Sequence, residues 1–254
     1  MDWKTYAGQH ALADFVPLEH EGARMLVRRG YEDAARLLVE CRTLPAVETL
    51  GGGREGHPVV VLPTGEKAVV RRYRRGGLMQ RVNESRYFGG NRAFDELRAT
   101  ERARTGGVRT ARILAAVERP RTVGYTALLA TLLIPGARDA AAWLADAEAE
   151  AKAEMLREAG RQMAAMHAAG VAHPDVHLRN LLVAEQDGAA PEVWLLDFDK
   201  ARVHAGAVPR ARRAEDLRRL ARSARKLRAE VGAEGWAALK EGYGDDWPPG
   251  VELR

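Results

Sequence analysis

Short apolar runs separated by turn residues fill much of the first half of the chain, a pattern typical of β-structure. The runs 59–62 and 68–70 flank the turn residues 63–65, Pro-Thr-Gly, and so predict a hairpin. In 31–41 the apolar side chains instead recur among charges at helical spacing, and Pro45 follows. We therefore expect one helix followed by paired strands.

The stretch 91–105 carries apolar side chains on one side and charges on the other, which predicts a second helix. The apolar runs 113–117 and 122–134 predict two further strands. We expect residues 1–134 to form an N-lobe with an N-terminal extension, a glycine-rich hairpin, a mostly antiparallel five-stranded sheet and one inserted helix.

The pattern changes after Pro135 and Gly136. Residues 140–169 are rich in alanine and carry apolar side chains at helical spacing up to Gly170, which predicts one long helix. Two short apolar runs, 181–183 and 193–196, predict a strand pair, and mostly helix follows. The fold class expected is therefore α+β, with a helical C-lobe over residues 135–254.

Composition indicates a soluble globular protein, since 46% of its 254 residues are hydrophobic. The single cysteine, Cys41, excludes a disulfide framework and a cysteine-rich zinc site. The N-terminus, MDWKTYAGQH, lacks the features of a secretion signal, and the longest apolar stretch, 125–134, is too short to cross a bilayer. We expect a protein that stays on the cytoplasmic side.

The net charge of +5 is unevenly distributed, because residues 201–228 hold ten arginines or lysines. Such a cluster indicates either an anionic partner or a solvated helix face, and the sequence leaves both open. The cluster has no interleaved aromatic residues, so we expect no nucleic-acid partner.

Two polar segments flank the second strand pair: "HPDVHLRN" at 173–180 before it and "DFDK" from Asp197 after it. If the two strands form a hairpin, Asp175, Asn180 and Asp197 lie at the same end of it. Mg²⁺ prefers oxygen ligands and shares them with phosphates, so Asn180 and Asp197 are candidate metal ligands and Asp175 a candidate base. Each residue taken singly could equally be a turn or cap residue.

The pattern H-x-D-x-x-x-x-N followed by a strand and D-F-D resembles the protein-kinase-like phosphotransferases. This resemblance implies a bilobal kinase-like fold in which Asp175 orients the acceptor hydroxyl, while Asn180 and Asp197 hold Mg²⁺ on the phosphates of ATP. It also implies that His173 packs under the turn at Phe198.

The resemblance extends upstream, where the glycine-rich segment 51–56 would cover the ATP phosphates through Gly52 and Gly53. "AVVR" at 68–71 stands where kinases have their phosphate-contacting lysine, so Arg71 takes that role, with Lys67 as the alternative. Glu96 on the following helix is then expected to pair with Arg71.

Several blocks are similar to the lipopolysaccharide-core kinases, which include the kinases of 3-deoxy-D-manno-octulosonic acid (Kdo). The blocks are RRYRRGGL (71–78), RYFGGNRAFDEL (86–97), LLATLLIPGA (128–137), GVAHPDVHLRNLL (170–182), WLLDFDKAR (194–202) and DLRRLARSARKL (216–227). The likeness implies ATP- and Mg²⁺-dependent phosphorylation of a Kdo-containing lipid A precursor by a protein bound peripherally to the anionic inner face of the inner membrane.

Two further classes remain open. One is a small-molecule kinase of the aminoglycoside-phosphotransferase type or an atypical protein kinase. His177, two residues after Asp175, is common to the former, and no A-P-E segment follows Asp197 as it does in conventional protein kinases. The other is a catalytically inactive nucleotide-binding scaffold, which the arginine at position 71 makes conceivable.

Overall fold

The computed structural model describes residues 3–6, 9–40, 46–50, 56–73, 92–122, 124–185 and 189–253. The chain divides into two compact units, and each is described by itself. The first comprises Met1–Arg98 and Arg112–Leu133, and the second comprises Ala99–Ala111 and Ile134–Arg254. The second unit thus includes a segment, 99–111, that was expected in the N-lobe.

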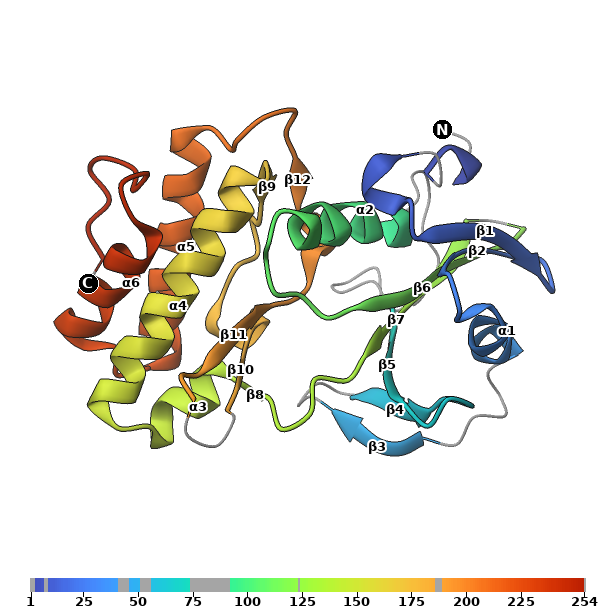
Figure 1. Ribbon diagram of the computed structural model, residues 1–254, viewed down its shortest axis with the longest axis horizontal. Coiled ribbons are helices and arrows are strands. Elements are labelled where there is room, and N and C mark those ends of the chain that lie inside the picture. The colour runs from blue at the N-terminus through green and yellow to red at the C-terminus, as the bar shows by residue number, and fades with distance from the viewer. Residues whose placement is uncertain are drawn as a thin grey trace. The chain divides into compact units, whose positions relative to one another are not determined.

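The first unit is built on an antiparallel sheet in the order β1-β2-β6-β7-β5-β4-β3 (Figure 1). The strands are β1 (Phe15–His20), β2 (Ala23–Arg28), β3 (Ala46–Leu50), β4 (His57–Val61), β5 (Lys67–Arg72), β6 (Ile113–Pro120) and β7 (Tyr125–Leu132). Both expected hairpins are confirmed: β4 pairs with β5, and β3 pairs with β4 across the glycine-rich segment.

The expectation of five strands is wrong, since the described part of this sheet has seven. The two extra strands, β1 and β2, lie in the segment expected to be an N-terminal extension. β2 is buried on both faces, with Met25, Leu26 and Val27 fully inaccessible. Charged residues at strand positions such as Glu19 and Arg24 interrupt the apolar pattern and hid these strands in the sequence.

Helices cover the two faces of the sheet. α1 (Glu32–Glu40) packs Ala35 and Leu38 onto one face, where alternate residues of β2, β4, β5 and β6 are buried. The start of α2 (Arg92–Thr105) packs Phe94 and Leu97 onto the other face, together with aromatic side chains from the N-terminal 3₁₀ turns. Both helices confirm the sequence prediction. The central strands of the sheet are buried because each face has its own apolar cover, whereas β3 at the edge is exposed.

The second unit is mainly helical. Its helices are α3 (Ala140–Asp146), α4 (Ala149–Ala168), α5 (Arg210–Leu227) and α6 (Gly232–Tyr243), and its strands are β8 (Arg138–Asp139), β9 (Val171–Ala172), β10 (Leu181–Ala184), β11 (Glu192–Leu195) and β12 (Arg202–Val203). The single long helix expected over 140–169 is wrong in one respect. The backbone is extended at Ala147 and Glu148, so α3 ends there and α4 begins anew.

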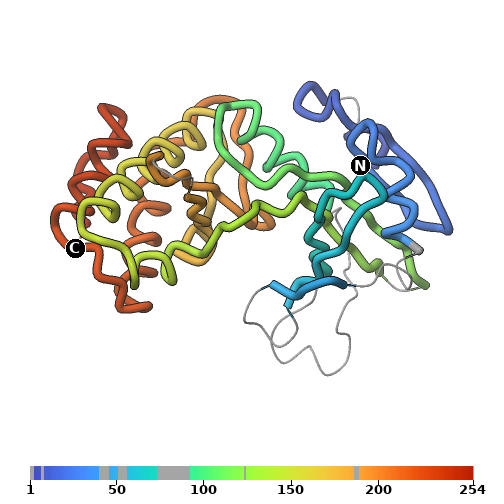
Figure 2. Tube along the Cα trace, turned by 60° about the horizontal axis from the view of Figure 1, so that its bottom comes forward, coloured from blue at the N-terminus to red at the C-terminus, as the bar shows by residue number. Residues whose placement is uncertain are grey.

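α4 and α6 run side by side, as Figures 1 and 2 both show. Glycines make this close approach possible. A Cβ built on Gly160 would lie 2.1 Å from the carbonyl oxygen of Leu239, and one on Gly242 would lie 1.9 Å from that of Arg157. Any side chain at either position would therefore push the two helix backbones apart.

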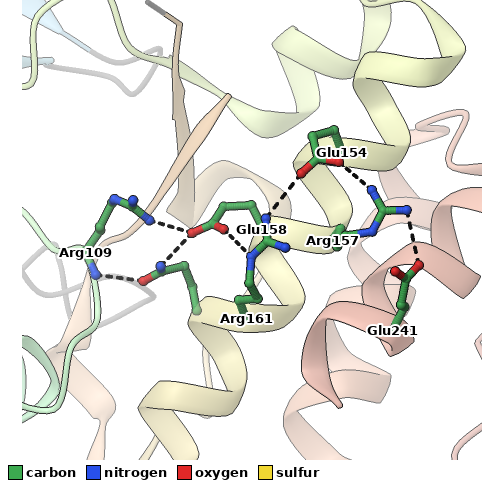
Figure 3. A network of polar contacts seen from close by, with 7 residues as sticks. Arg109, Glu154, Arg157, Glu158, Arg161 and Glu241 are labelled. Atoms are coloured by element: carbon green, nitrogen blue, oxygen red, sulfur yellow. Dashed lines mark hydrogen bonds and ion pairs between the residues drawn. The ribbon is translucent and has the colours of Figure 1, made fainter. Parts of the chain in front are cut away.

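A polar network holds the segment 99–111 to α4 (Figure 3). The backbone N–H of Arg109 donates to Gln162 Oε1 at 2.7 Å, and its guanidinium donates to Glu158 Oε1 at 2.5 Å. Gln162 in turn donates to the same Glu158 oxygen, and Arg161 donates to the other. Because the carboxylate of Glu158 is mostly buried, these donors stabilise its charge and fix the segment that leads into β6.

Candidate active site

The loop between β9 and β10 carries most of the predicted polar residues. The hairpin on which their placement depends is confirmed: β10 and β11 pair antiparallel, with Leu181 opposite Leu195. One position further, the N–H of Leu196 donates to the carbonyl oxygen of Asn180 at 2.9 Å. Asn180 therefore stands beside the residue that precedes Asp197, although seventeen positions of sequence separate the two candidate metal ligands.

The side chain of Asn180 is buried and oriented. Its amide nitrogen donates to the backbone carbonyl of Asp175 at 3.1 Å. This bond uses the nitrogen, so the side-chain oxygen is the atom that a cation would take. It also fixes the backbone of Asp175 relative to Asn180.

Asp197 has an unusual backbone conformation, with φ 62° and ψ 62°. Only three non-glycine residues of the described chain have positive φ, and aspartate tolerates this region better than most residues. The turn it produces ends strand β11 and starts the 3₁₀ turn Phe198–Lys200. Strain of this kind concentrates at functional sites, where the surrounding structure holds it.

His173 packs against this turn, as the family resemblance implied. Its ring lies 5.0 Å from that of Phe198 between centroids, and its Nε2 lies 2.9 Å from the carbonyl oxygen of Leu196. Burial lowers the pKa of His173, so the ring is neutral and Nε2 donates its proton to that carbonyl. A neutral buried imidazole here is a structural element of the site.

Asp216 on α5 anchors the start of the loop and is not among the site residues expected from the sequence. Its Oδ2 accepts the backbone N–H of His173 at 2.7 Å and lies 3.2 Å from Nε2 of His167. Nδ1 of His167 lies 2.7 Å from the hydroxyl of Tyr243. The sequence contains one indication of its role. Asp216 falls on the same side of an arginine-rich helix as Leu217 and Leu220, which are buried.

Asp175 is half-exposed, and its side chain contacts a cation. Lys200 Nζ donates to Asp175 Oδ2 at 3.3 Å, with side-chain exposures of 65% for the lysine and 36% for the aspartate. The carboxylate is thus accessible for a substrate and has one of its two oxygens bonded to an ammonium group.

In the first unit, Arg71 and Glu96 form the expected ion pair. Glu96 is 2% exposed and its other carboxylate oxygen accepts the hydroxyl of Tyr73, which sequence reasoning missed. Tyr73 directly follows the end of β5 and lies two positions after Arg71, so an extended chain places both side chains on the same side. The guanidinium of Arg71 also lies 4.9 Å from the centre of the Tyr73 ring.

The remaining residues expected at the phosphates are Lys67, Gly52 and Gly53. Lys67 stands at the exposed start of β5, and Gly52 and Gly53 lie outside the described residues.

The donors at the hairpin suit a magnesium ion that phosphates help to coordinate. Asn180 and Asp197 offer an amide and a carboxylate oxygen, the hard donors that Mg²⁺ prefers. Within the described ranges, no three His, Cys, Asp or Glu side chains gather as a metal cage. In phosphoryl transfer this ion is usually held by two protein ligands, and the substrate supplies the remaining ones.

No helix among the described residues is long and apolar enough to span a bilayer.

An antiparallel-sheet unit, a helical unit and this polar hairpin together define a kinase-like phosphotransferase. Residues 47–243 match the model of the lipopolysaccharide kinase (Kdo/WaaP) family. The chain belongs to this family.

Curated relatives agree with this assignment. The chain is 34% identical to 3-deoxy-D-manno-octulosonic acid kinase of Actinobacillus succinogenes over 70% of this chain and 76% of that one. It is 33% identical to the kinase of the same name from Xanthomonas oryzae, over 72% and 71% of the two chains. With that of Vibrio cholerae it shares 34% identity over 55% of this chain, and it spans only 59% of that relative's length.

A solved structure described as WaaP in complex with acyl carrier protein matches with a TM-score of 0.62 at 19% identity. The match covers 87% of this chain and 88% of that one. It shows the same fold.

Proposed function

We propose that this chain transfers the γ-phosphoryl group of ATP to a sugar hydroxyl of Kdo on a lipid A precursor, with Mg²⁺. One observation carries the proposal: the β10–β11 hairpin holds Asn180 beside the turn that starts at Asp197, and Asn180 is bonded to the backbone of Asp175. Relatives named as Kdo kinases support the choice of acceptor.

In this proposal, Asp175 accepts the proton of the acceptor hydroxyl while the hydroxyl oxygen forms a bond to the γ-phosphorus. The bond from that phosphorus to the β–γ bridging oxygen breaks, and ADP leaves with the electron pair. Asn180 and Asp197 hold Mg²⁺, which when bound neutralises charge on the phosphates. Arg71, held by Glu96, contacts the phosphates, and Gly52 and Gly53 remain predictions for the covering loop.

A peripheral position at an anionic membrane surface is the second part of the proposal. α5 buries its apolar side in the core of its unit and leaves a row of basic side chains exposed. The exposed residues on α5 include Arg210, Arg212, Arg218, Arg219, Arg222, Arg225 and Lys226. Each basic residue near an anionic leaflet contributes about 1 kcal/mol. Sedimentation with anionic vesicles, and not with neutral ones, would support this part.

Labelled γ-phosphate provides the test of the reaction. Wild-type protein is incubated with labelled ATP and, in separate reactions, with Kdo-lipid A precursor, an aminoglycoside and a protein substrate. Label on the Kdo acceptor alone is the expected result, and Asp175→Ala should reduce it by roughly 10²–10⁴-fold. Label on the antibiotic or the polypeptide would overturn the acceptor, and no transfer at all would favour an inactive nucleotide-binding scaffold.

A further inference from the structure

Lys200 is the cationic side chain that the structure shows on the carboxylate of Asp175. In protein serine/threonine kinases a lysine stands two positions after the catalytic aspartate, whereas this chain has His177 there. The ammonium group beside Asp175 comes instead from the segment that follows β11.

The backbone of this segment is held at both ends. Phe198, 1% exposed, packs on His173, and the N–H of Ala201 donates to the carbonyl of Phe198 at 2.9 Å. Immediately afterwards β12 pairs with β9, the strand from which the catalytic loop starts. The base of the Lys200 side chain is therefore fixed relative to Asp175, which distinguishes it from a lysine on a free surface.

The charges around Lys200 explain why a cation is needed there. Asp175, Asp197 and Asp199 all lie within or beside this turn, and the donor substrate brings the charges of a triphosphate. One N–H of the ammonium group is bonded to Asp175 Oδ2, which leaves Oδ1 for the acceptor hydroxyl. The other N–H groups lie on an exposed side chain, where a bound substrate can accept them.

We propose that Lys200 is a further catalytic residue, which binds the carboxylate of Asp175 and the phosphoryl group in transfer at the same time. The inference rests on the proposed function, because it assigns Lys200 to the same phosphoryl-transfer step. Lys200 then acts where negative charge accumulates during transfer, so it stabilises the transition state more than the bound substrate.

Two substitutions test the proposal, Lys200→Met and Lys200→Arg, with Lys240→Met as the matched control on the exposed side of α6. Lys200→Met should lower kcat on the order of 10²-fold, leave the KM for ATP within about threefold, and leave Tm unchanged. Lys200→Arg keeps the charge and should recover at least a tenth of the wild-type kcat. The control should match wild type.

A double-mutant cycle with Asp175→Asn tests whether the two side chains act on the same step, while a lower kcat at unchanged Tm separates this role from a merely structural ion pair. If the two side chains act on the same step, Lys200→Met costs much less in the Asp175→Asn background than in wild type. Equal losses in both backgrounds, or a wild-type kcat for Lys200→Met, would overturn the inference. If wild type itself transfers no phosphate to the Kdo acceptor, the proposed function fails first, and the two failures are distinguishable.

Discussion

The glycine contact between α4 and α6 predicts that a single methyl group will destabilise the helical unit. In an open helix position, Gly→Ala raises stability by about 1 kcal/mol, since alanine is the better helix former. At Gly242 the new Cβ would lie 1.9 Å from the carbonyl oxygen of Arg157, where real Cβ contacts are not below 3.0 Å. The obstacle is backbone, so a rotamer change cannot relieve it.

The size of the effect follows from this geometry. The helices must separate by about 1 Å along a well-packed interface that includes Leu156 and Leu239. Overpacking of this kind costs about 1–3 kcal/mol beyond the propensity gain. We expect a net loss of about 2 kcal/mol for Gly242→Ala, which corresponds to a Tm lower by roughly 4–8 °C for a chain of this size.

Thermal unfolding followed by circular dichroism measures this shift, with Gly235→Ala on the same helix as the control. A Cβ at Gly235 would meet Leu156 Cδ1 at 2.6 Å and Val231 Cγ1 at 3.1 Å, both ends of side chains that can rotate. The control should therefore melt within about 2 °C of wild type. If Gly242→Ala melted at or above the wild-type temperature, the close approach of α4 and α6 would be refuted.

Three further predictions concern polar groups. Burial raises the pKa of Glu118 to about 8 from 4.5, so the folded chain keeps a proton that the unfolded chain loses and wild-type stability falls as pH rises between these values. Denaturant unfolding should show Glu118→Gln free of this fall and, above pH 8, more stable than wild type by up to roughly 4–5 kcal/mol. Tyr73→Phe removes the hydroxyl bonded to Glu96 and should cost about 1–2 kcal/mol in the same assay. Asp216→Asn removes the charge that holds the N–H of His173 and should cost about 2–3 kcal/mol and reduce kcat more than KM in steady-state phosphotransfer assays.

Each of these predictions has its own control. For Glu118, the control is Glu19→Gln at an exposed ion pair with Lys4, and parallel stability curves for Glu118→Gln and wild type would contradict a protonated carboxyl. For Tyr73, the control is Tyr31→Phe, whose hydroxyl bonds Glu66 near the surface and should cost less. An Asp216→Asn protein with wild-type kcat would remove this aspartate from the support of the catalytic loop.

The local elements could be read from the sequence where apolar spacing was regular. α1, α2, the β4–β5 hairpin and the β10–β11 hairpin all follow from periodicity and turn residues. The same spacing placed Asn180 and Asp197 at one end of a hairpin, because strand pairing is a local matter over so short a connection. The ion pair of Arg71 with Glu96 came from the family resemblance and not from periodicity.

Long-range packing could not be read in this way. β1 and β2 could not be predicted because charges interrupt their apolar pattern; β1 is paired with β2, and β2 joins the rest of the sheet through β6. The break between α3 and α4 was hidden in a run of good helix formers. Tyr73 and Asp216 became visible only when the fold brought them to Glu96 and to the backbone of His173.

The sequence by itself determined which side chains can do chemistry here and the order in which short elements present them, because periods of two and 3.6 residues are properties of neighbouring positions. The tertiary structure decided which buried partners hold those side chains. Asp216 lies forty-three positions from His173, and Lys200 lies twenty-five from Asp175. Contacts over such separations depend on how helices and strands pack, and no local pattern records them.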